Sequence, residues 1–399
     1  MSGANELLAE VAGIGRESGG GYTRLSWDAA TMELREWFAG QADALGLDLV
    51  VDGNGNQVAW WGSGTGALLL GSHLDSVPNG GPLDGPLGVT SALAAVAALQ
   101  REGWRPARPI AVANFTDEEG GRFGVACLGS RLVTGAIATE TALGLRDADG
   151  NTLAEVMAAR GFAPEAAGVA DWLDQVSSYI ELHVEQGRWL APAAAPVGVA
   201  TAIWPHGRYR FDFCGQGNHA GATAMADRHD PMLAYAATVL AARELASATD
   251  QRATLGRVRI EPNSTNSIPS RVTAWLDARA SSEAGLEALV AAIVSKAQLA
   301  AEVDGTSVEV RAESVSGAVE FDHALRHRLA ALLDAPVLPT GAGHDAGILA
   351  AKLPTAMLFV RNPTGVSHAP EEFATPEDID AGVAALIQVV REVGSEAAR

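Results

Sequence analysis

The first half of the chain alternates between short apolar runs and longer mixed stretches. Apolar runs at residues 67–70, 110–115 and 178–184 predict buried strands, and the Ala/Leu-rich stretch 89–100 predicts a helix. Polar clusters follow the runs. This alternation favours an α/β sheet with helices on both faces, in which chemistry takes place where the strands end.

The pattern changes after Trp204. Residues 208–213 alternate polar and apolar, which is typical of a strand solvated on one face. Asp230-Pro231 then predicts the start of a long helix, with the aspartate as N-cap and proline in the first turn. The same texture continues with strands at 272–278 and 307–312 and a helix at 286–301.

The last part of the chain returns to the first pattern, with an apolar strand at 356–360 and a helix that begins after Thr375. We therefore predict one α/β catalytic domain, residues 1–204 and 315–399, interrupted by a smaller α+β domain, residues 205–314. The length of 399 residues also exceeds what a single core usually supports.

Composition narrows the possible partners. The net charge of −20 repels phosphate backbones and anionic lipid, so neither nucleic acid nor a membrane is an expected partner. The N-terminus lacks the pattern of a signal peptide, and no apolar run approaches the ~20 residues of a membrane span. Two cysteines, Cys127 and Cys214, are too few for a disulfide framework. We expect a soluble, cytoplasmic protein.

Five polar clusters lie at predicted strand ends or in loops beside them, and each contains one of the candidate ligands given at the end of this paragraph. Each has an ordinary structural interpretation, such as a His–Asp pair, a turn aspartate or a solvated acidic turn. Together they favour a metal centre, because adjacent carboxylates stay ionised only when solvated or neutralised by cations. The candidate ligands are His73, Asp84, Glu119, His183 and His368.

Three histidines and two carboxylates suit divalent zinc, manganese, cobalt or nickel, and one carboxylate can bridge two ions. Such ions polarise a scissile carbonyl and activate a bound water, whose proton a carboxylate outside the metal's coordination must take. Glu118, beside Glu119, is the natural base. Asp75 is placed to hold the His73 imidazole in the required tautomer.

Competing catalytic motifs are missing from the sequence. There is no His-Glu-x-x-His, no Walker lysine and no Gly-x-Ser-x-Gly elbow. The loops 215–220 and 341–346 fit a loose G-x-G-x-x-A pattern, but neither has the strand–loop–helix context of a dinucleotide site.

Six segments in order resemble the M20 metallopeptidase clan, over roughly residues 65 to 375. Within it they resemble the branch of N-carbamoyl-L-amino-acid hydrolases, allantoate amidohydrolases and β-ureidopropionases. The segments are GSHLDSVPNGGPLDGPLGV, TDEEGGRF, ELHVEQG, GNHAGATAM, PNSTNSIPSR and RNPTGVSHAPEE. The resemblance implies a mixed-sheet metallohydrolase domain, with a ferredoxin-like inserted domain that forms a homodimer.

The same resemblance implies roles for individual residues. His73 and His183 would bind one metal ion, Glu119 and His368 a second, and Asp84 would bridge them. Asp75 would orient His73, and Glu118 would act as general base and then acid. The positions matching the oxyanion-stabilising and substrate-binding residues are His219, Gln186, Asn218, Asn266 and Arg279, the last for the substrate carboxylate.

We therefore expect a metal-dependent amidohydrolase that cleaves a ureido or carbamoyl C–N bond of a small anionic substrate. Allantoate is slightly favoured over N-carbamoyl-L-amino acids. One alternative is a dipeptidase or N-acyl-amino-acid deacylase of the same clan, and another is a catalytically silent scaffold. Departures from the family pattern at Leu83, Ala222, Ala224 and Ser270 remove no ligand. Those in the segment 222–225 and at Ser270 leave the exact substrate open.

Overall fold

A computed structural model describes residues 3–396 of the chain. The chain divides into two compact units. Unit 1 contains the described residues up to Ala202 and from Glu320 onward, and unit 2 is Ile203–Val319. These limits lie close to residues 204 and 315, where the hydropathy pattern changes.

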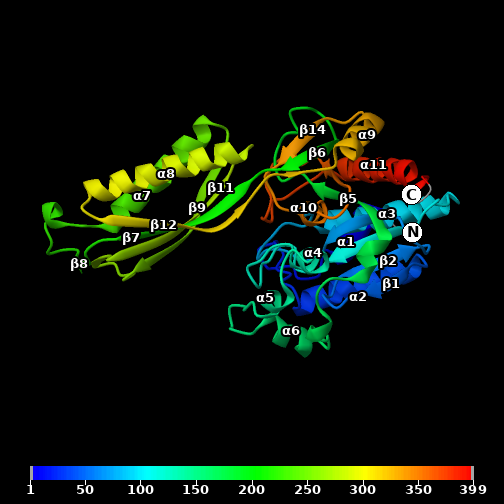
Figure 1. Cartoon of the computed structure of the whole chain (residues 1–399), viewed down its shortest axis with the longest axis horizontal. Coiled ribbons are helices and arrows are strands. Elements are labelled where there is room, and N and C mark those ends of the chain that lie inside the picture. The colour runs from blue at the N-terminus through cyan, green and yellow to red at the C-terminus, as the bar shows by residue number, and fades with distance from the viewer. Residues whose placement is uncertain (1–2, 397–399) are drawn as a thin grey trace. The chain divides into compact units, whose positions relative to one another are not determined.

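Unit 1 is built on a mixed nine-stranded sheet (Figure 1). Strands β3, β4, β5 and β15 are parallel to their neighbours within this group, whereas β2 and β6 pair with it in antiparallel fashion. The carboxyl ends of the four parallel strands therefore meet at one edge. In sheet order the strands are β1 (Asp48–Val51), β2 (Gln57–Trp61), β4 (Ile110–Phe115), β3 (Ala67–His73), β5 (Val176–Val184), β15 (Thr355–Val360), β6 (Val197–Ile203) and β13 (Val319–Glu320), with β14 (Val337–Thr340) beside β6.

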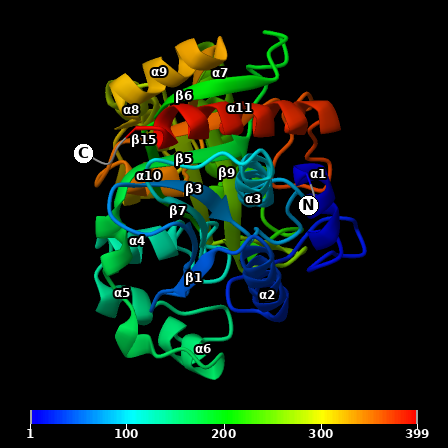
Figure 2. The ribbon, with the colours of Figure 1, turned by 90° about the vertical axis from the view of Figure 1, so that its right-hand side faces the viewer.

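Helices cover both faces of this sheet. On one face, alternate residues of β5 and β15 such as Leu182 and Leu358 join the core formed with α1 (Ala4–Val11), α3 (Pro86–Arg101) and α11 (Pro376–Gly394). Figure 2 shows the ribbons of these three helices beside the strands of the sheet. Gly88 allows α3 to approach closely, since a Cβ there would lie 2.4 Å from the Leu182 carbonyl oxygen. The remaining helices of unit 1 are α2 (Ala29–Ala44), α4 (Leu128–Thr134), α5 (Thr139–Leu143), α6 (Leu153–Ala159), α9 (His323–Leu333) and α10 (Asp345–Leu349).

Unit 2 is a four-stranded antiparallel sheet with two helices on one face (Figure 1). The strand order is β12 (Ser307–Ser316), β7 (His206–Cys214), β11 (Arg271–Arg279) and β9 (Arg252–Glu261). The helices are α7 (Pro231–Ala248) and α8 (Glu283–Val303), and a short ribbon pairs β8 (Asn218–His219) with β10 (Ser267–Ile268).

The strands and helices expected from the hydropathy pattern are confirmed. Strand β4 has the predicted limits, and the Asp230 side chain caps α7 by accepting from the Met232 N–H at 3.0 Å. Among the described helices, α8 alone is long and apolar enough for a membrane span by length and composition. One of its faces, including Leu286 and Ile293, packs into the core of unit 2, as in a globular α+β unit.

Candidate metal centre and active site

The predicted metal ligands converge at the carboxyl edge of the parallel strands in unit 1. His73 is the last residue of β3 and His183 lies near the end of β5. Glu119 follows β4, His368 lies in the segment after β15, and Asp84 lies two residues before α3. Segments distant in sequence meet here because parallel strands present their carboxyl ends together.

Asp84 occupies the centre of this group. Its Oδ1 lies 3.1 Å from His183 Nε2 and 3.6 Å from His73 Nε2. Its Oδ2 lies 3.0 Å from His368 Nε2, and that nitrogen is 3.5 Å from Glu119 Oε2. The result is two three-residue groups, each compatible with a metal ion, that share one carboxylate.

Several of the proposed ligand atoms lack a hydrogen-bond partner, which is consistent with the binding of cations here. The Nε2 atoms of His73 and His183 and Oε1 of Glu119 are buried without a hydrogen-bond partner in the described chain. Each histidine Nδ1 instead lies against a backbone carbonyl, at 3.0 Å from Asp75 and 2.9 Å from Val184. This contact leaves the Nε2 lone pair directed at Asp84, which is the usual preparation of a metal-binding histidine.

A third group of Glu181, His183 and His344 also has metal-like proximity. Its carboxylate is already engaged, because Glu181 accepts from the Ser72 hydroxyl at 2.7 Å and from the Ala346 N–H at 3.0 Å. It also shares His183 with the first group. We therefore do not assign this group as a separate metal site.

Glu118 lies at the same edge as a buried carboxyl group. Its Oε2 is 3.7 Å from His73 Nε2, and its Oε1 accepts from the Cys127 thiol at 3.1 Å. Burial raises the pKa of Glu118 well above its usual value, although the nearby His73 opposes this effect. A carboxyl group with a raised pKa can take up and return a proton near neutral pH.

Asp75 makes a contact that the sequence did not indicate. Its carbonyl oxygen holds the His73 ring, whereas its carboxylate is 3.6 Å from Nδ1. The two carboxylate oxygens accept from the backbone N–H groups of Glu118 at 3.2 Å and Glu119 at 3.1 Å. Asp75 thus fixes both the imidazole and the segment that carries the base and a ligand.

Glu372 is a buried residue of this region that the sequence reasoning missed. Its Oε2 accepts from the N–H groups of Leu83 and Asp84 at 2.8 and 2.9 Å, and its Oε1 accepts from the Ser367 hydroxyl at 2.9 Å. Its position four residues after His368 was the only signal. Gln186, a predicted substrate residue, donates to Asp84 Oδ2 at 2.8 Å.

Unit 2 brings together three further predicted residues. Asn218 and His219 form β8, and the Ala220 N–H donates to the Asn266 carbonyl oxygen at 2.9 Å. His219 Nδ1 accepts from two backbone N–H groups, each at 3.1 Å. The proton of the neutral ring is therefore on Nε2, which makes this atom a hydrogen-bond donor.

Arg279 is separated from these residues within the same unit. It ends β11 and donates to both carboxylate oxygens of Asp277, at 2.7 and 3.1 Å. Asn266 precedes the other end of β11. The nine residues of this strand span roughly 26 Å at about 3.3 Å a residue.

Comparison with known proteins extends these observations. The model of peptidase family M20/M25/M40 matches residues 69–392. The chain belongs to this family. The matched range contains all five predicted ligand positions, the whole of unit 2 and the larger part of unit 1.

Similar proteins within M20 resemble this chain over nearly its whole length. It is 36% identical to an N-carbamoyl-L-amino acid amidohydrolase of Geobacillus stearothermophilus, over 96% of each chain. It is 31% identical to the allantoate amidohydrolase of Escherichia coli, over 96% of this chain and 95% of that one. A hydantoinase/carbamoylase family amidase of Burkholderia vietnamiensis has a similar structure, with a TM-score of 0.89, 31% identity and coverage of 99% and 97%.

These similarities identify the chain as a metal-dependent amidohydrolase, an enzyme that cleaves C–N bonds of linear amides other than peptides. The dipeptidase and deacylase alternative is no better supported.

Proposed function

We propose that the enzyme hydrolyses the carbamoyl or ureido C–N bond of a small carboxylate-bearing substrate, using two divalent ions per chain. The observation that carries this proposal is the Asp84 carboxylate, with one oxygen facing His73 and His183 and the other facing His368. The higher identity to an N-carbamoyl-L-amino acid amidohydrolase now favours that substrate class over allantoate.

When bound, the ions would polarise the scissile carbonyl and activate water. His73, His183, Asp84, Glu119 and His368 would hold them. The ligand set suits zinc, manganese, cobalt or nickel.

Glu118 would carry the proton. Its carboxylate takes a proton from the attacking water and gives it to the leaving nitrogen as the carbonyl C–N bond breaks. Asp75 keeps this carboxylate in place through the Glu118 N–H. For a carbamoyl substrate the products are the free amine and a carbamate, which decomposes to ammonia and carbon dioxide.

We also propose that the active enzyme is a homodimer formed through unit 2. Arg279 would bind the substrate carboxylate, while His219 Nε2 and Asn266 would bind the carbonyl side. Strand β11 spans roughly 26 Å, with Asn266 before one end and Arg279 at the other, which supports the two sets coming from different subunits. Exposed apolar side chains on α7 and α8 support an interface there: Leu240, Leu299 and Val303 are 59%, 56% and 78% exposed.

The cytoplasm is the compartment we propose. Both cysteines are free thiols, Cys127 buried and Cys214 partly so, which fits a reducing environment.

The test measures release of ammonia and of free amino acid after loading with manganese or zinc, because hydrolysis of an N-acetyl amino acid or a dipeptide forms no ammonia. The panel contains N-carbamoyl-L-amino acids, allantoate, β-ureidopropionate, an N-acetyl amino acid and a dipeptide, with chelator-treated enzyme as control. Metal-dependent release from one ureido acid supports the proposal and names its substrate group. Turnover of only the acetylated amino acid or the dipeptide would replace it by the deacylase or dipeptidase alternative.

A further inference from the structure

One end of the unit 2 sheet carries two arginines side by side. Arg279, the last residue of β11, is the register partner of Arg252, the first residue of β9. Their neighbours Ala278 and Ala253 pack in the core of unit 2, so both arginines point from the face that the helices leave uncovered. Directly opposed side chains on paired strands start about 4.5–5.5 Å apart at Cβ, so one small ligand can contact both.

The two arginines differ in how their charges are compensated. Like charges directly opposite on neighbouring strands repel each other, so each guanidinium calls for an anion. Arg279 donates to both carboxylate oxygens of Asp277, at 2.7 and 3.1 Å. Within residues 3–396, Arg252 forms an ion pair only with Asp250, at 3.0 Å, and that carboxylate is 80% exposed. Such an open pair contributes little, so Arg252 retains most of its capacity to attract a further anion.

Arg252 is held by one end of its guanidinium. Its Nη1 donates to Asp250 Oδ1 and to the carbonyl oxygens of Asp250 and Gln251, at 2.9 to 3.0 Å. The guanidinium carbon also lies 5.6 Å from the ring centre of Trp204. Nε and Nη2 make no hydrogen bond to the part of the chain that the structure describes. These two nitrogens form the edge of the guanidinium that can bind a carboxylate through two parallel hydrogen bonds.

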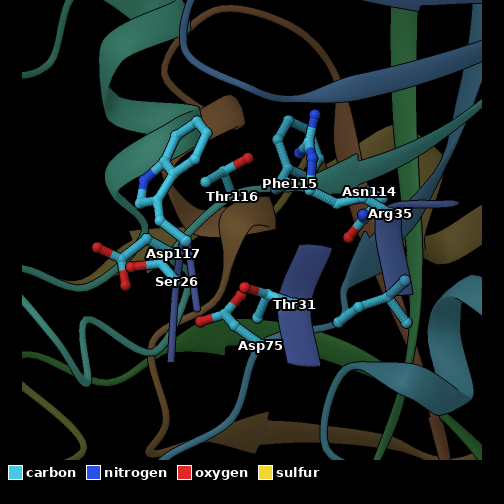
Figure 3. Close-up of a pocket in the computed structure, with 10 residues that line it drawn as sticks. Ser26, Thr31, Arg35, Asp75, Asn114, Phe115, Thr116 and Asp117 are labelled. Atoms are coloured by element: carbon cyan, nitrogen blue, oxygen red, sulfur yellow. The ribbon is translucent and has the colours of Figure 1, made fainter. Parts of the chain in front are cut away.

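The distribution of charge also favours an anion on unit 2. The chain has a net charge of −20, but unit 2 contributes only −2, from 11 Arg and Lys against 13 Asp and Glu. An anionic group is therefore repelled less by unit 2 than by the rest of the chain. Asp75 and Asp117 line the cavity of unit 1 that Figure 3 shows, which makes it unsuited to a carboxylate. The arginine of that cavity, Arg35, already donates to the Gly55 carbonyl oxygen.

We propose, building on the carbamoyl hydrolysis and the role of Arg279 proposed above, that the enzyme prefers N-carbamoyl amino acids with an acidic side chain. Arg279 binds the α-carboxylate and Arg252 binds the side-chain carboxylate. The two carboxylates of an aspartyl or glutamyl group are only a few carbon atoms apart, which suits two directly opposed side chains. A substrate with one carboxylate would leave Arg252 without an anion. Hydrolysis consumes one water, breaks the carbamoyl C–N bond and gives aspartate or glutamate together with carbamate.

The test measures kcat/KM of the full-length, metal-loaded enzyme for two pairs of substrates. N-carbamoyl-L-aspartate is compared with N-carbamoyl-L-asparagine, and N-carbamoyl-L-glutamate with N-carbamoyl-L-glutamine. We expect the acid of at least one pair to be preferred about 10-fold, mostly through KM, the lower end for charge-assisted hydrogen bonds because Arg252 is half-exposed. Arg252→Gln should reduce this acid-to-amide ratio to about 1, and Arg252→Lys, which keeps the charge, should retain part of it.

Arg259→Gln is the matched control and should keep the wild-type ratio. Arg259 lies on the same strand and face as Arg252, and it pairs with Glu261 two residues away at 2.9 Å, as Arg252 pairs with Asp250. A wild-type ratio near 1, a ratio unchanged in Arg252→Gln, or an equal decrease in Arg259→Gln would each overturn the preference, while turnover of the amides would still support the proposed function. No turnover of any ureido acid would refute the proposed function, and this preference with it.

Discussion

At the scale of single residues, Asp84 and Glu118 are two buried carboxyl groups whose pKa values shift in opposite directions. Asp84 is completely buried, which opposes its ionisation, but the three imidazoles around it prevail and lower its pKa well below the usual value. Glu118 is equally buried, and burial raises its pKa. A bridging ligand must remain ionised, whereas a proton carrier must alternate between two states, so the two environments suit the two roles.

Replacing Glu118 by glutamine tests the second role. The amide keeps the size of the side chain but cannot take a proton, so we expect kcat to fall by about 10²- to 10⁴-fold. Metal content, measured by elemental analysis, should remain that of the wild type, because Glu118 is not a proposed ligand. Loss of metal in this variant would contradict the assignment.

Replacing Arg279 by glutamine tests the recognition of the substrate carboxylate. Charge-assisted hydrogen bonds contribute about 1.5–3 kcal/mol, so we expect KM to rise about 10- to 100-fold with kcat much less affected. Asp277 retains Arg208 as a neighbour at 3.7 Å, so the fold should persist. The control is a substrate whose carboxylate is replaced by a carboxamide. The KM for this carboxamide should be the same in the wild type and in Arg279→Gln. If the substitution raised the KM of the carboxamide as much as that of the carboxylate, the proposed role would be refuted.

Residue identities at strand ends could be predicted because polar side chains after buried strands stand out in the sequence. The contacts that hold these residues in place could not be predicted from the sequence. Cys127 reaches Glu118, and Glu372 reaches Asp84, only through the packing of loops whose conformation has no periodic signal. For the same reason, we predicted from the sequence that the Asp75 carboxylate orients His73. In the structure the Asp75 carbonyl oxygen lies closer to His73 Nδ1 than the carboxylate does.

At the scale of elements, Glu372 joins the segment after β15 to the segment before α3. It holds the backbone of Asp84 and the side chain of Ser367, the neighbour of His368. Asp84 and His368, two proposed ligands of the second ion, therefore both depend on the buried carboxylate of Glu372. Gly81 leaves space for it, since a Cβ there would lie 2.3 Å from the Glu372 carboxylate.

Glu372→Gln should lower metal affinity by about 10- to 100-fold, as loss of outer partners of metal ligands commonly does. The amide retains one acceptor oxygen but places a donor against Ser367 or the backbone N–H groups. Titration of metal-free enzyme against a chromogenic chelator measures the effect. Glu371→Gln, at the adjacent exposed position, is the matched control and should bind metal as the wild type does.

In unit 2, Asp212 links three strands through Arg210, Thr273 and Arg311. Burial opposes its ionisation, but the hydrogen bonds from these partners prevail and lower its pKa to about 2. A lowered folded-state pKa stabilises the fold above the unfolded pKa near 4, and this contribution disappears as the pH falls toward 2.

We therefore expect Asp212→Asn to cost about 1 kcal/mol at pH 7, a value reduced because Arg311 is half-exposed. Urea denaturation of both proteins between pH 7 and pH 2 should show the difference shrinking below pH 4. A difference that stays constant with pH would exclude the ion pairs as its cause.

The long apolar runs were predictable as elements because burial on both faces leaves a continuous hydrophobic signal. Strand β1 was not predicted, since its four residues are mostly exposed. The ribbon of β8 and β10 was also missed, because two-residue strands have no period to detect. These short elements carry His219 and Asn218, so their residues were found by resemblance to relatives and not by pattern.

At the scale of the whole molecule, unit 2 is an insertion between β6 and β13 of the unit 1 sheet. The return of the first hydropathy pattern after residue 314 made an insertion predictable. The strand order β1-β2-β4-β3-β5-β15-β6-β13 was not predictable, because it depends on pairings between strands far apart in sequence. The resemblance to M20 proteins implied a mixed sheet but no strand order.

The proposed dimer predicts recovery of activity between two inactive variants. The Glu118→Gln variant lacks the proposed base but can supply His219 to its partner. The His219→Ala variant lacks this histidine but retains Glu118. After the two are unfolded and refolded together, half of the dimers should be mixed, and each should contain one complete site. Activity should therefore reach about a quarter of the wild-type value. Glu118→Gln mixed with Glu118→Gln/His219→Ala is the control and should stay inactive; equally low activity in both mixtures would exclude sharing between subunits.

The spread of the ligands along the chain also bears on how the enzyme is made. His368 comes 284 residues after Asp84 in the chain. A ribosome must therefore add this whole stretch before the proposed second ion can have its histidine. On this proposal the complete metal centre forms only after both segments have been synthesised and the parallel strands have paired.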